Sequence, residues 1–237
     1  MRRTDGSAAG WARRGRRGGR PGANRTRPAP ALAGLLLAVA LVLAGGGGSS
    51  LQAQVTWETP RLLGSEVPRG LGLHYVDFGA LPGDGRGVLA TWTGGLPAGL
   101  RLRGGFAEGA GGENAGFGGL DVWTRLTGPS ESVPVDVLWT SGVGLGVGEW
   151  TLVSVPVGLT VGRSWSGGSV WISPFVHAGV VFDLRVGDGA PEDEFQVGVA
   201  TDVGVHLALD RGRRVVVSAS AGLGDRQAWA VGLVLRP

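Results

Sequence analysis

The stretch Ser169–Arg185, SVWISPFVHAGVVFDLR, decides the fold class because apolar residues occupy every second position. Its even positions carry only Val, Ile, Pro, Ala, Phe and Leu, whereas its odd positions mix Ser, His, Gly, Asp and Arg with a few apolar residues. Successive side chains of a strand point to opposite faces, so this period of two predicts a long β-strand. Trp150–Trp165 and Phe195–Leu209 repeat the pattern. Because about 10 tilted residues cross a hydrocarbon core, these stretches predict membrane-spanning strands.

The first 53 residues have the features of an export signal. Nine Arg precede an apolar run, Ala31–Ala44, and a small-residue stretch follows it. We expect cleavage after Ala53. The alternative is a transmembrane anchor, but that needs about 20 apolar residues and this run has 14. Residues 1–53 are therefore expected to be a signal peptide, residues 54–68 a periplasmic tail, and residues 69–237 an outer-membrane domain.

Removal of the signal reverses the charge of the chain. The whole sequence has a formal net charge of +3, but nine of its 22 basic residues and only one of its 19 acidic residues precede Gln54. The remaining 13 Arg face 18 Asp and Glu, so the mature chain is acidic. A basic footprint for phosphate backbones is absent, which excludes nucleic acid as an expected partner. The chain contains no Cys, which rules out disulfides and thiolate metal sites.

Turn residues divide the mature chain into ten strand candidates. These are 71–79, 87–94, 99–108, 115–127, 135–148, 150–164, 169–185, 195–210, 214–223 and 227–236. No stretch outside the signal has a helical apolar period. The chain is therefore predicted to be all-β, an antiparallel up-and-down meander. Unpaired backbone groups are costly in lipid, so the first and last strands must join. We expect a closed transmembrane β-barrel of ten strands, or of eight if the 71–94 hairpin lies outside the wall.

The two faces of each strand are assigned by their side chains. In Phe195–Leu209 the odd positions carry no charge, as expected against lipid, and the even positions are small or polar, as expected in a narrow lumen. A soluble periplasmic barrel that binds an apolar ligand would also alternate, with its apolar face inward, and is kept as an alternative.

With these features the chain resembles the small bacterial outer-membrane β-barrel proteins, the group that includes the transmembrane domain of the OmpA type. The resemblance is carried by the signal, the lack of Cys, and strands such as Val153–Trp165 and Ser173–Val186. It covers about 71–236. Such families usually end on an aromatic residue that the barrel-assembly machinery reads, whereas this chain ends Leu235-Arg236-Pro237. The resemblance implies location in the outer membrane of a Gram-negative bacterium, contact with its lipid, and passage through that machinery.

The alternation of side chains between the two faces of each strand predicts which charged residues point into the lumen. They are Arg101, Arg103, Asp121, Arg125, Asp136, His177, Asp183, Arg185, Asp202 and His206. Charges in a narrow interior must pair or lose their charge, so this set predicts a lumenal charge network that plugs the barrel. Trp150 and Trp165 lie at the two ends of one strand and are expected at the membrane interfaces.

The expected function is a structural or surface-interaction role without enzymatic turnover, cofactor or metal, with exterior loops that contact an extracellular ligand. A porin-like pore lined by the same charges is an alternative. So is a lumenal enzyme built on His177 and His206 with Ser173, although Asp202 and His206 are about 13 Å apart along their strand. The acidic loop 192–194 is more typical of a solvated turn than of a metal site.

Overall fold

The computed structural model describes residues 60–78, 85–109, 114–130, 134–148, 150–187, 195–223 and 226–236. The predicted signal peptide, residues 54–59 of the predicted tail and the loop 192–194 lie outside this part of the chain. No helix in the described residues is long and apolar enough to cross a membrane.

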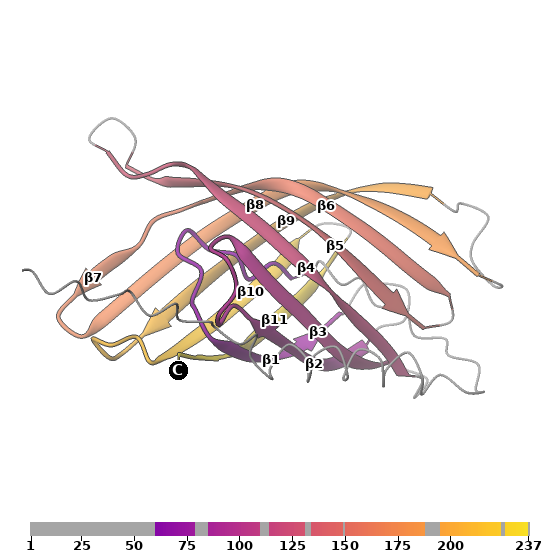
Figure 1. Ribbon diagram of the computed structural model, residues 1–237, viewed down its shortest axis with the longest axis horizontal. Coiled ribbons are helices and arrows are strands. Elements are labelled where there is room, and N and C mark those ends of the chain that lie inside the picture. The colour runs from indigo at the N-terminus through magenta and orange to yellow at the C-terminus, as the bar shows by residue number, and fades with distance from the viewer. Residues whose placement is uncertain are drawn as a thin grey trace, which may run out of the picture.

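The described residues form eleven strands in one antiparallel sheet (Figure 1). Their bounds are β1 Leu71–Asp77, β2 Gly85–Trp92, β3 Leu100–Gly109, β4 Asn114–Thr127, β5 Asp136–Val147, β6 Thr151–Gly162, β7 Trp165–Gly167, β8 Val170–Val186, β9 Phe195–Ala208, β10 Val215–Leu223 and β11 Ala228–Leu235. Apart from β7, each strand has bounds within a few residues of the predicted ones, because turn residues interrupt the alternation at each connection.

Two pairings close the sheet into a barrel. β1 pairs with β11 from Leu71↔Leu235 to Asp77↔Trp229, and β6 pairs with β8 from Thr151↔Val186 to Gly162↔Phe175. Ten strands therefore form a closed antiparallel barrel that includes the first hairpin, as the favoured prediction stated. β7, which was not predicted, pairs only with residues 170–172 of β8 and stands outside the closed ring.

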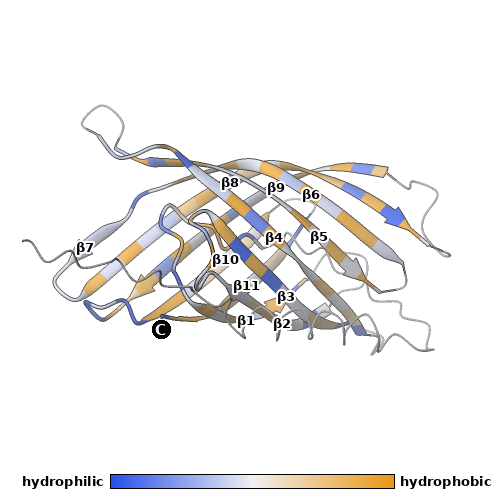
Figure 2. Ribbon diagram, in the orientation of Figure 1, coloured by the Kyte–Doolittle hydropathy of each residue, from blue (hydrophilic) through white to orange (hydrophobic). Residues whose placement is uncertain are grey.

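Apolar side chains cover the outer face of the barrel wall. Along β8, Val176 and Phe182 are 51% and 38% exposed, whereas the intervening His177 and Asp183 are 1% and 3% exposed. The alternation of hydropathy along the strands is visible in Figure 2. The structure therefore places the apolar stripes outside, where the predicted assignment of faces put them, and not around an internal cavity.

Residues 60–68, here called the plug, precede β1, and residues 60–65 of the plug are buried inside the barrel (Figure 1). Arg61, Leu62, Leu63 and Ser65 are at most 2% exposed. Leu62 joins an apolar cluster with Val76, Phe78 and Phe117 near the end where β1 meets β2, here called the loop end. The other end, where Leu71 and Leu235 lie, is here called the termini end. The buried part of the predicted tail is thus packed inside the barrel and is not part of its wall.

Candidate functional site

Asp121 joins several polar groups of the lumen. It lies on β4, points inward and is fully buried. Its Oδ2 accepts hydrogen bonds from Nε and Nη2 of Arg101 on β3, at 2.8 and 2.6 Å. Its Oδ1 accepts one from Nη1 of Arg61 in the plug, at 3.0 Å. One carboxylate thus joins the wall to the plug by charge-assisted hydrogen bonds, the stronger kind.

The plug backbone is also bound to the wall on both sides. The backbone N–H of Arg61 donates to Oδ1 of Asp202 on β9 at 3.1 Å, and Arg101 Nη1 donates to the carbonyl of Leu62 at 2.8 Å. Ser65 Oγ is 3.0 Å from Ser173 Oγ on β8. Backbone groups inside a barrel need such partners, because an unpaired buried group costs about 1–3 kcal/mol.

A second buried ion pair lies nearer the loop end. Arg226, in the connection between β10 and β11, forms a short ion pair with Asp183 on β8. Ser154 Oγ donates to the other oxygen of Asp183 at 2.5 Å. Among the described residues the buried charges balance, with four Arg against four Asp: Arg61, Arg101, Arg103, Arg226, Asp121, Asp136, Asp183 and Asp202. A balanced set avoids the large cost of isolated buried charge.

Two of the three buried His residues, His177 and His206, bind hydroxyl groups. His177 Nδ1 is 3.0 Å from Thr160 Oγ1, and His206 Nδ1 is 2.8 Å from Ser218 Oγ. Both rings are at most 1% exposed, so a substrate has no access to them in this arrangement. His177 is opposite Asp202 in the β8–β9 register. The geometry thus gives the enzyme alternative one Ser–His pair, His206 with Ser218, which is buried in the described structure.

Small residues on the lumenal face make room for these larger groups. A Cβ at Gly158 would come within 2.6 Å of the His177 ring, and one at Gly198 within 2.7 Å of the Arg226 guanidinium. A Cβ at Gly64 in the plug would come within 2.8 Å of both His206 and Phe175. Gly therefore faces the lumen where a large side chain from a neighbouring element fills the space.

Eight of the ten predicted lumenal residues are buried within the wall; Arg125 and Arg185 are not. Arg125 has a side chain that is 53% exposed at the termini end, where its Nε is 3.3 Å from Oδ1 of Asp136. The β4–β5 register is regular as far as Arg125↔Leu138 and shifts only between Arg125 and Thr127. Arg185 donates to Gln196 Oε1 at an exposed position. Both residues therefore lie at the rims of the barrel, where their side chains are not enclosed as those of the other eight are.

Sequence reasoning missed Arg61, Arg226 and His74. Arg61 and Arg226 lie outside the strands, in segments without a period, so no signal pointed to them. His74 is buried between outward Leu73 and Tyr75, and the parity of 71–79 could have identified it.

The two Trp residues predicted at the membrane interfaces lie at opposite ends of β6. Trp150 precedes the strand and is partly buried, whereas Trp165 follows it in β7 and is 47% exposed, with Arg163 over its ring at 5.6 Å. Their contact with an interface stays a prediction.

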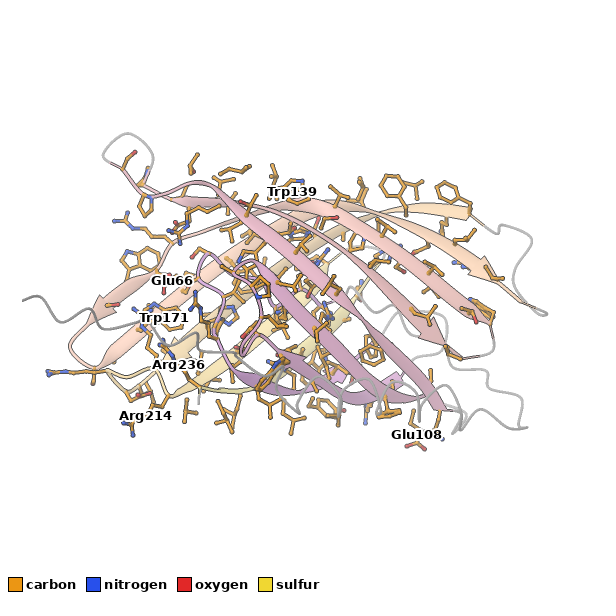
Figure 3. All side chains as sticks on the ribbon, viewed as in Figure 1. Glu66, Glu108, Trp139, Trp171, Arg214 and Arg236 are labelled. Carbon is orange, nitrogen blue, oxygen red and sulfur yellow. The ribbon has the colours of Figure 1, made fainter. Side chains whose placement is uncertain are left out.

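A cavity of about 890 Å³ opens at the termini end, and it is here called the cup. It lies between the plug, the β2–β3 connection and the inner faces of Trp123 and Trp171. Figure 3 shows Glu66, Trp171 and Arg236 together at this end and Glu108 at the other. Nearby, the backbone N–H of Arg214 holds the pKa of Asp210 below its ordinary value.

No group of three or more His, Asp or Glu in the described residues could hold a metal ion. The chain matches no protein-family model, no curated protein and no solved structure.

Proposed function

We propose that this protein is a non-enzymatic β-barrel of a bacterial outer membrane, with a plugged lumen and a structural or surface-interaction role. The observation that carries the proposal is a closed barrel that is apolar outside and charged inside. In this proposal residues 1–53 are the cleaved signal, the termini end faces the periplasm, and the loop end presents its connections to the exterior.

The outer wall supports contact with lipid. Val, Leu, Ile and Phe are exposed at alternate positions along β8, β9 and β11, and the outward positions of these strands carry no charged residue. Soluble monomers rarely expose an apolar patch larger than a few hundred Å². An even strand number also brings both termini to the same end, as in outer-membrane barrels.

The lumen supports a plugged barrel over an open pore. The plug fills the interior with buried Leu62 and Leu63, and Arg61 is fixed between Asp121 and Asp202. A small pore remains the second candidate function, because the filling comes from a terminal segment and the wall would persist if that segment moved.

Cell fractionation tests this proposal. The chain is expressed with its own N-terminal region in a Gram-negative host, membranes are washed at alkaline pH, and boiled and unboiled samples are compared on a detergent gel. We expect a wash-resistant outer-membrane band that shifts on boiling. A soluble periplasmic band without a shift would reject the membrane location.

A further inference from the structure

We propose that the cup binds a small organic anion, a carboxylate or phosphate ester with an apolar or aromatic body. The acidic group of this ligand would replace Glu66 at Arg213. The termini end has the same geometry wherever the barrel resides. Four Arg and one acidic residue line the cup, although the chain after residue 53 is acidic as a whole.

Arg213 is the centre of the proposed site because its backbone and side chain are both held. Among the described residues it is the one non-glycine residue with positive φ, at 48°. Its N–H donates to the carbonyl of Asp210, and its guanidinium stacks 4.5 Å from the centroid of the Trp171 ring. Such a conformation is uncommon outside Gly, and residues held in it cluster at binding sites.

Glu66 shows what Arg213 binds. Glu66 Oε2 is 2.5 Å from Arg213 Nη1, and the two side chains are 39% and 34% exposed. Arg213 Nη2 also donates to Ser166 Oγ. A planar guanidinium fixed on an aromatic ring is suited to carboxylate and phosphate oxygens. Because the pair is open to the cup, an external anion can compete for Arg213 with the intramolecular carboxylate.

Two further cations extend the site. Within the described part of the chain, Arg69 and Arg236 make no ion pair, and both side chains are exposed. They supply further positive charge to the cup. Trp123, Leu96 and Pro97 give the cup an apolar wall, and its volume is within the range of small-molecule pockets. The combination selects an anion with an apolar part.

Binding of phenyl phosphate to the purified full chain in neutral detergent, measured by calorimetry, tests the proposal. We expect phenyl phosphate to bind, and phenol, which lacks the charge, to give no heat. Arg213→Gln should raise the Kd about tenfold or more, because it removes the bidentate donor. The matched control is Arg211→Gln, which removes one charge from the same turn outside the cup and should leave the Kd unchanged.

The Glu66→Gln variant distinguishes two roles of the Glu66–Arg213 pair, a site at which a ligand replaces Glu66 and a purely structural ion pair. If Glu66 competes with the ligand, its neutralisation lowers the Kd for phenyl phosphate. Absence of binding, equal effects of R213Q and R211Q, or weaker binding by E66Q would overturn the proposal. If R213Q loses the gel shift of a folded barrel, Arg236→Gln replaces it, because that side chain makes no ion pair in the described structure.

Bilayer discs of two lipid compositions distinguish a soluble anion from a lipid phosphate as the ligand of the cup. In phosphatidylcholine discs phenyl phosphate should bind as in detergent. Unchanged binding in discs that also contain phosphatidylglycerol would assign the cup to a soluble anion, whereas loss of binding there would assign it to a lipid phosphate.

Discussion

At the scale of single residues, Asp121 shows how the lumen tolerates charge. It is fully buried and accepts three hydrogen bonds from two Arg, one on the wall and one on the plug. A buried ion pair adds little to the free energy of unfolding compared with apolar residues of similar volume. The loss of one partner, however, leaves a buried charge uncompensated.

Asp121→Asn is therefore expected to lower the free energy of unfolding by about 3–5 kcal/mol. The measurement is reversible urea unfolding in detergent or lipid vesicles. Asp77→Asn is the control, because Asp77 pairs at 3.2 Å with an Arg86 side chain that is 77% exposed. That change should cost less than about 1 kcal/mol. Equal losses in the two variants would contradict the buried network.

A second prediction for a single residue concerns Gly64 in the plug. Gly64→Ala places a methyl group 2.8 Å from the rings of His206 and Phe175, so it should destabilise the barrel by about 1–3 kcal/mol. Gly128→Ala, whose added Cβ meets nothing within 4 Å, should change stability by less than about 0.5 kcal/mol. Urea unfolding compares the two. A neutral Gly64→Ala would show that the plug does not pack as the structure has it.

At the scale of elements, the strands could be predicted from sequence and the plug could not. Alternation fixed both the position and the inward face of β8, because the same parity runs from Val170 to Val186. The alternation did not show that Arg125 lies at the rim, where its side chain is 53% exposed. Residues 60–68 have no period, and their place in the lumen depends on contacts with Asp121 and Asp202, which are 60 and 141 residues away from Arg61.

We expect removal of the plug to raise the conductance of the barrel. The full chain reconstituted in a planar bilayer should give no steady current, because buried side chains of the plug fill the lumen. A variant that lacks residues 54–66 should conduct, since Arg101, Asp121 and Asp202 would line a water-filled interior. Its gel shift on boiling serves as the control for folding. Equal currents from the two proteins would contradict the plug.

At the scale of the whole molecule, the barrel reverses the usual arrangement of a soluble protein. Its interior holds balanced Arg and Asp, and its exterior exposes Val, Leu, Ile and Phe along the wall. The Glu66–Arg213 pair and the cup lie at one end, and the apolar cluster around Leu62 lies towards the other. Soluble monomers rarely expose an apolar surface of this extent, so we expect a nonpolar medium or partner to cover it.

The most direct test of this account is the unfolding free energy of Val180→Arg in phospholipid vesicles. Val180 is 39% exposed near the middle of β8, whereas Leu209 is 67% exposed just beyond the end of β9. If the wall faces lipid, Val180→Arg should cost roughly 2–4 kcal/mol and Leu209→Arg about 0–1 kcal/mol. If water covers the wall, both substitutions should be within about 0.5 kcal/mol of the wild type, and the membrane account would be wrong.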